Sequence, residues 1–97
     1  MPSYGTLGHF TEQGLRDIKN APKRAEAFKA AAKQMGCTVK EIVYTQGQYD
    51  VITIVDAPDE TTMNALVLSV MELGNVRGQT LRAYSVAEME KVVEKVA

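Results

Sequence analysis

The fold of this chain is decided by the stretch YDVITIVDA, residues 49–57. Side chains alternate between the two faces of a strand. Val51 and Val55 therefore lie on one face, and Ile52 and Ile54 lie on the other. A strand that is apolar on both faces is usually central in its sheet and covered on both sides. We expect residues 49–57 to form a central strand, which requires a cover for each face.

Three weaker strands are predicted around this one. Residues 3–10 alternate in character, residues 37–45 precede the central strand, and residues 76–84 follow it. In the second of these, Val39 and Val43 fall on one face by simple alternation, with Ile42 on the other. The turn at residues 46–48 contains a glycine, so it predicts a hairpin between the second and third strands.

Helices are predicted between and after these strands from apolar spacings of three and four residues. A short helix follows Thr11 and breaks near Asn20, and a longer one ends at Gly36. Another helix starts after the predicted cap Asp59. The sequence from Ser85 to Glu88 has the form of a capping box, which predicts a final helix.

The element order is therefore β-α-β-β-α-β-α, which predicts an α+β fold. Two βαβ halves joined by a hairpin make a ferredoxin-like plait, here with an extra C-terminal helix, and its strands take the order 4-1-3-2. Its helices cover only one face of the sheet. Because residues 49–57 are apolar on both faces, a second copy is the simplest cover for the other face, and two sheets packed face to face form a dimeric α+β barrel.

Composition narrows the classes of function. The chain has 97 residues, which is one domain over 1–97, and its net charge is −1, which disfavours binding to nucleic acid. One cysteine and one histidine make a metal site improbable, and we expect no cofactor. The first residues lack the pattern of a signal peptide and no stretch is long enough to span a membrane, so we expect a cytoplasmic protein without membrane contact.

Four short motifs resemble the GYD domain family, a family of small proteins without a settled biochemical function. They are Gly47-Gln48-Tyr49-Asp50, Phe10-Thr11-Glu12-Gln13-Gly14, Leu73-Gly74-Asn75-Val76-Arg77 and Thr80-Leu81-Arg82-Ala83. The resemblance implies a ferredoxin-like fold and carries over no catalytic residue. Gly78 stands where the family more often has a larger polar residue, which would open space near the fourth strand.

Asp50 and His9 are the candidates for catalysis. A carboxylate at the start of a buried strand is costly unless it is paired. Asp50 either ties down the hairpin, acts as a base or ligand anchor in a cleft, or is solvated at the strand end. His9 titrates nearest neutral pH, so it is either a hydrogen-bonded structural residue or a catalytic base. Cys37 follows the end of a predicted helix, whose dipole raises the pKa of a thiol, so we expect it to be unreactive.

Ligand-binding candidates are two phenols and two guanidinium groups on predicted strands: Tyr44, Tyr49, Arg77 and Arg82. Phenols on strands pack and hydrogen-bond, or line a pocket. The two arginines lie five positions apart and so on opposite faces. Each is either a salt-bridge partner or a group that orients an anionic ligand.

These observations favour a homodimeric small-molecule-binding protein, with a cofactor-independent oxygenase or isomerase acting on a small polar or aromatic molecule as the alternative. RNA-recognition domains share the strand order, but they display stacking aromatics on the third strand. Here that strand is aliphatic from Val51 to Val55, which disfavours RNA binding.

Overall fold

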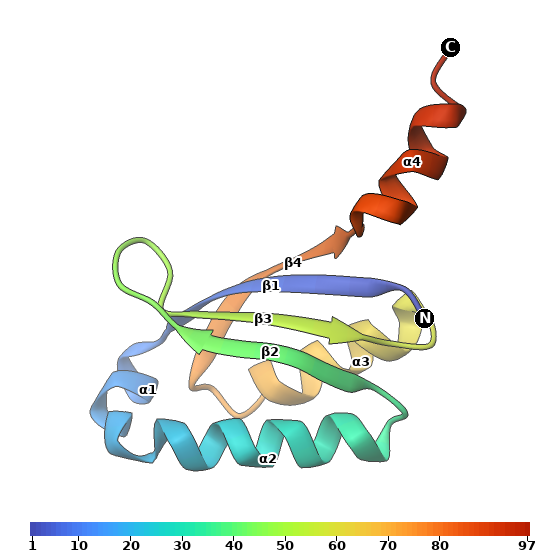
Figure 1. The fold of residues 1–97 in the computed structure, drawn as a ribbon. Coiled ribbons are helices and arrows are strands. Elements are labelled where there is room, and N and C mark those ends of the chain that lie inside the picture. The colour runs from blue at the N-terminus through green and yellow to red at the C-terminus, as the bar shows by residue number, and fades with distance from the viewer.

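A four-stranded antiparallel sheet forms the frame of the structure, a computed structural model of residues 1–97 (Figure 1). The strand order is β2-β3-β1-β4, which is the predicted order read from the opposite edge. This α+β arrangement agrees with the predicted ferredoxin-like plait. The elements in chain order are β1 (Ser3–Phe10), α1 (Glu12–Arg16), the 3-10 turn η1 (Ile18–Asn20), α2 (Ala21–Gln34), β2 (Thr38–Tyr44), β3 (Val51–Asp56), α3 (Glu60–Met71), β4 (Val76–Ala83) and α4 (Val86–Glu94).

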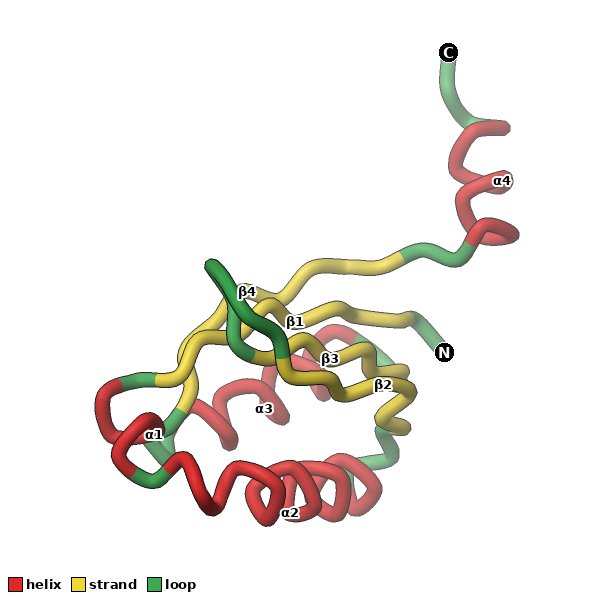
Figure 2. The backbone as a smooth tube through the Cα atoms, turned by 60° about the vertical axis from the view of Figure 1, so that its left-hand side comes forward, coloured by secondary structure: helices red, strands yellow, loops and turns green.

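Helices cover one face of the sheet only. α2 and α3 lie side by side beneath it, and no helix lies across the opposite face (Figures 1 and 2). α4 leaves the end of β4 and points away from the rest of the chain, on the side opposite α2 and α3. The fold therefore has two layers plus a projecting helix. None of its helices has both the length and the apolar character needed to cross a membrane.

The central strands have the predicted two-sided character. β3 pairs with β1 on one side and β2 on the other, and its Val55 is fully buried under the helices. The uncovered face, which we call the open face, is apolar at its centre. Its apolar side chains are Leu7, Val43, Ile52, Ile54 and Leu81, which the strand registers place on one side of the sheet.

Strand boundaries differ from the prediction at one functional position. β3 begins at Val51, so Tyr49 and Asp50 belong to the loop that precedes it. The ladder between β1 and β3 stops at the pair Gly8 and Val51. The side chain of Asp50 turns back to the end of β1 instead of continuing the alternation of the strand.

A β-bulge in β2 changes which of its side chains share a face, so the predicted faces of this strand are wrong. The register with β3 shifts between Val39 and Glu41, leaving Lys40 as the extra residue. Val39 consequently packs against the buried core, whereas Val43 lies on the open face and is 45% exposed. Simple alternation placed these two valines on the same face, and that expectation was wrong because a bulge reverses the alternation.

The predicted helix starts are confirmed. The Thr11 side chain caps α1 by accepting from the amide of Gly14. Asp59 caps α3 by accepting from the amide of Thr62 at 2.7 Å, and these hydrogen bonds hold the pKa of Asp59 below its usual range. The break between the two predicted helices appears as η1, which ends at Asn20.

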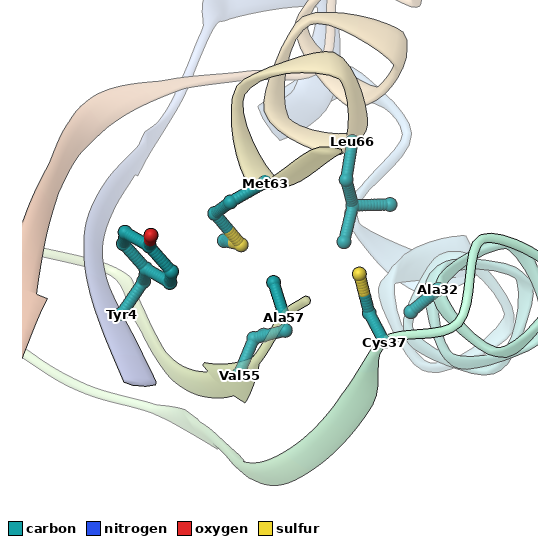
Figure 3. Close-up of a cluster of buried hydrophobic side chains, with 7 residues drawn as sticks. All are labelled: Tyr4, Ala32, Cys37, Val55, Ala57, Met63 and Leu66. Atoms are coloured by element: carbon teal, nitrogen blue, oxygen red, sulfur yellow. The ribbon is translucent and has the colours of Figure 1, made fainter. Parts of the chain in front are cut away.

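The buried core lies at one end of the sheet, where β1 begins and β3 ends. Side chains from α3 point into it toward the strand residues (Figure 3), and its members are Tyr4, Ala32, Cys37, Val55, Ala57, Met63 and Leu66. Burial raises the pKa of the Cys37 thiol, and the nearby charge of Asp59 raises it further. The thiol is therefore unreactive, as the sequence predicted, although burial rather than the end of a helix is the main cause.

The two leucines of α3 provide a matched test of this core. Leu66 is fully buried, whereas Leu68 is 57% exposed on the same helix. We expect Leu66→Ala to lower the free energy of unfolding by about 2–5 kcal/mol, through lost burial and the cavity left behind. Leu68→Ala should change it by less than about 0.5 kcal/mol. Urea denaturation followed by circular dichroism measures both, and equal losses would contradict the assignment of this core.

Candidate functional site

An apolar cavity lies at the end of the sheet opposite the core, between the strands and the two helices. Its volume is about 100 Å³, and 12 of its 17 lining residues are hydrophobic. α2 contributes Ala25 and Phe28, and α3 contributes Val67 and Val70. The covered side of the sheet is thus filled at one end and hollow at the other.

Two glycines form part of the sheet side of this cavity. Gly8 of β1 and Gly78 of β4 are directly opposite each other in the ladder, and both line the cavity. A Cβ atom on Gly78 would lie 2.5 Å from the backbone oxygen of Leu7, so no other residue fits without moving the strands. A Cβ atom on Gly8 would lie 2.8 Å from Cγ1 of Val51. Because neither residue has a side chain, the sheet presents bare backbone to the cavity. The sequence predicted such open space near the fourth strand from Gly78.

Three of the four polar side chains that line the cavity have hydrogen-bond partners. The hydroxyl of Tyr44 donates to the carbonyl oxygen of Ala21 at 3.0 Å. The guanidinium of Arg24 donates to the backbone oxygen of Asp17 at 2.7 Å, and its charge is balanced by the Asp17 carboxylate at 3.3 Å. Thr6 shares a hydrogen bond with Thr80 at 3.1 Å. The cavity therefore offers apolar contact and few free hydrogen-bonding groups.

Aromatic and charged side chains surround one side of the cavity. The ring of Phe10 lies 6.2 Å from that of Tyr44, measured between centroids, and the guanidinium of Arg24 lies 5.9 Å from the Phe10 centroid. Tyr44 is 48% exposed, so this side of the cavity approaches solvent.

Three predicted site residues gather at a second place, the corner formed by the β2–β3 loop and the end of β1. The His9 and Tyr49 rings stack with their centroids 5.2 Å apart, and Nδ1 of His9 lies 3.0 Å from the carbonyl oxygen of Gln48. Oδ2 of Asp50 accepts from the amide of Phe10 at 2.9 Å. His9, Tyr49 and Asp50 thus share one corner, whose chemistry is dominated by bonds to backbone groups.

Asp50 joins three strands at this corner. Its amide donates to the carbonyl oxygen of Gly8 at 2.8 Å, and its own carbonyl oxygen accepts from the amide of Thr45 at 2.9 Å. The hydroxyl of Thr45 also donates to the carbonyl oxygen of Tyr49. This geometry favours the interpretation of Asp50 as a residue that ties down the hairpin, over that of a free base in a cleft.

The other ligand-binding candidates lie apart from one another. Tyr44 lines the cavity. Arg77 is opposite His9 in the ladder, and its guanidinium donates to the carbonyl oxygen of Met71 at 2.8 Å. Arg82 is at the far end of β4, with its guanidinium 4.5 Å from the Tyr84 centroid. The predicted residues therefore do not converge on a single site, although the two arginines do lie on opposite faces.

The cavity lining was absent from the sequence-based candidates. Ala25, Phe28 and Val67 appear in the sequence only as parts of ordinary helical apolar stripes. The local sequence held one signal, Gly78, but its partner Gly8 becomes apparent only from the register of β1 against β4. Nowhere in the structure do three or more His, Cys, Asp or Glu side chains come together in a way suited to holding a metal ion.

Comparison with known proteins adds two findings. The family model for the GYD domain matches residues 4–93. The chain is also similar to a protein of Thermus thermophilus named glutamine synthetase and cystathionine beta-lyase binding protein. The two are 28% identical over 90 residues, which cover 92% of this chain and 95% of the relative.

The corner makes a prediction about stability. Asp50→Ala removes the acceptor of the Phe10 amide, and we expect it to lower the free energy of unfolding by about 1–3 kcal/mol. Asp50→Asn keeps an acceptor oxygen and should cost less. Urea denaturation measures both losses, and hydrogen exchange by NMR should show the Phe10 amide exchanging faster in Asp50→Ala. Unchanged exchange at Phe10 would contradict the role given to Asp50.

Proposed function

This chain belongs to the GYD domain family, and we propose that it acts as a homodimeric small-molecule-binding protein rather than as an enzyme. The single observation that carries the proposal is the apolar cavity beside the Gly8 and Gly78 pair. Binding sites for small molecules are concave and mostly apolar, and they often lie between the layers of a fold. The cavity has each of these properties.

The size and lining of the cavity indicate the class of ligand. A volume of about 100 Å³ suits a compact apolar molecule, since a cavity of about 150 Å³ lined by aliphatic side chains binds benzene or xenon. The hydroxyl of Tyr44 and the guanidinium of Arg24 are already engaged by backbone oxygens. A ligand that carries a buried charge would have to replace those bonds, so the site favours a neutral molecule.

The composition of the open face supports the homodimer. Its aliphatic side chains extend to both edge strands, where Val43 of β2 and Leu81 of β4 are 45% and 43% exposed in the single chain. Polar residues lie toward its two ends, with the hydrogen-bonded pair Ser3 and Asp56 at one end and His9 opposite Arg77 at the other. An apolar centre with a polar rim is the usual anatomy of a protein interface. Two such faces packed together would form the predicted α+β barrel.

The enzyme alternative has weaker support. Both of its candidate residues lie at the corner, where Asp50 accepts from the amide of Phe10 and His9 is within hydrogen-bonding distance of Gln48. A general base must be free to reach the proton of a substrate. Neither His9 nor Asp50 lines the apolar cavity, so a substrate bound there would not meet either candidate base.

A protein-binding role is the second candidate. The similar protein from Thermus thermophilus is named for binding two enzymes. The exposed apolar centre of the open face would suit a protein partner as well as a second copy. The oligomeric state of the free protein separates these two uses of the same face.

Replacing either of two alanines of α2 by leucine tests the cavity. Ala25 lines it, whereas Ala30 is exposed on the same helix. Because a leucine side chain at position 25 fills the space, Ala25→Leu should weaken binding of a xenon or benzene probe at least tenfold. Ala30→Leu should leave binding unchanged. Titration followed by amide NMR shifts at Gly8 and Gly78 measures the affinity, and a probe that shifts neither glycine would disprove the site.

A charge on the open face tests the homodimer. Light scattering of the wild type should give a mass of about twice 10.6 kDa at micromolar concentration. Ile52→Glu places a carboxylate at the centre of that face, where burial is costly, and should give a monomer. Leu68→Glu, an equal change on the outer side of α3, should leave the dimer intact. A wild-type monomer at all concentrations would disprove the homodimer.

A further inference from the structure

The projecting helix α4 carries an apolar stripe that nothing in its own chain covers. Val86, Met89 and Val93 recur at helical spacing along one side, and Val96 continues the line just beyond the helix. Their exposed fractions are 81%, 48%, 55% and 70%. A helix of only nine residues that makes few contacts with the rest of the chain is marginal in water, because nucleation is costly and a short helix forms few hydrogen bonds to offset it. The stripe therefore needs a cover.

The start of α4 carries several contacts that set the direction of the helix relative to β4. Only Tyr84 and Ser85 connect it to β4. Ser85 and Glu88 form a complete capping box, and hydrogen bonds from Ser85 hold the pKa of Glu88 below its usual range. Arg82 stacks over Tyr84 and pairs with Glu88 at 3.4 Å. These contacts fix the direction in which α4 leaves the sheet.

α4 therefore extends on the same side of the sheet as the open face. α2 and α3 occupy the opposite side of the sheet, and α4 rises on the side of the open face (Figures 1 and 2). A second copy seated on the open face would thus lie within reach of α4. In a twofold-symmetric dimer, the α4 helix of each copy would lie beside the other copy.

The open face is small for an interface. Its strands are 8, 7, 6 and 8 residues long, which at ~3.4 Å per residue and ~4.8 Å between strands gives a projected area of roughly 470 Å². Two such faces lie near the lower limit of the ~1,200–2,000 Å² that a stable interface buries. A contact made by the apolar stripe of α4 from each copy would enlarge this interface.

We infer that α4 is an exchanged arm, which packs its apolar stripe against the second copy of this chain in the homodimer. The inference rests on the homodimer proposed above, and it adds a contact that the open face alone does not provide. The charge of α4 agrees with a protein partner. Three glutamates and two lysines lie between Glu88 and Lys95, so the helix has no excess of positive charge for an anionic lipid surface.

Two substitutions on α4 test the arm. Val93→Glu puts a charge in the middle of the stripe, and Ala87→Glu puts the same charge on the opposite side of the helix. Sedimentation of the full-length chain over a range of concentrations gives the dissociation constant of the dimer. We expect Val93→Glu to raise it at least tenfold and Ala87→Glu to raise it less than threefold. Equal constants for wild type and Val93→Glu would overturn the inference.

A second measurement locates the arm directly. Cys37 is buried, so a Glu90→Cys variant takes a thiol-reactive spin label at position 90. This labelled chain is mixed with an isotope-labelled wild-type chain, and in the mixed dimer the label broadens the wild-type amide signals that lie near it. We expect such broadening at a defined patch of amides. A dimer without it would overturn the arm and leave the homodimer standing, whereas a wild-type monomer would overturn both.

A lipid surface is the remaining use of such a helix, and it is tested in the same way. Vesicles that contain phosphatidylserine are mixed with the full-length chain and sedimented. We expect no binding, in agreement with the negative charge of α4. Binding that Val93→Glu abolishes and Ala87→Glu preserves would assign α4 to a membrane surface and overturn the inference.

Discussion

Two helices can cover only one face of a sheet whose central strands are apolar on both faces, and this imbalance determines the rest of the structure. β3 places Val55 beneath the helices and Ile52 on the uncovered side, so neither face is built for water alone. The helices take the first face. The second face and the apolar stripe of α4 are left uncovered, and α4 extends on the side of that face. The chain thus leaves two apolar surfaces exposed, the open face and the stripe of α4.

The covered side is itself divided along the strands. At one end, large side chains such as Met63 and Leu66 are buried between α3 and the strands. At the other end, the glycine pair and Ala25 leave a hollow of about 100 Å³. Close packing stabilises a fold, and a dry hollow forfeits contacts that its lining atoms would otherwise make. The filled end stabilises the fold, so the hollow end is free to serve binding.

Local patterns in the sequence predicted most of the fold and little of the site. The first strand, the caps at Thr11 and Asp59 and the capping box at Ser85 follow from rules about neighbouring residues, and the structure confirms them. The bulge at Lys40 does not, because it depends on how β2 pairs with β3. The cavity depends in the same way on a pairing across 70 positions, from Gly8 to Gly78. Features that depend on the register between strands cannot be predicted from the periodicity of a single segment.

The GYD motif is connected to the cavity through Phe10. The backbone amide of Phe10 is held by Asp50 of the motif, while its ring lies against Tyr44 and near Arg24 at the cavity. The amide and the ring belong to one residue at the end of β1, so the bond that fixes the amide also limits where the ring can lie. Asp50 is thereby linked to the cavity without touching it. Under the proposed binding function, the motif would contribute by positioning the wall of the cavity, while its carboxylate accepts a hydrogen bond from the backbone.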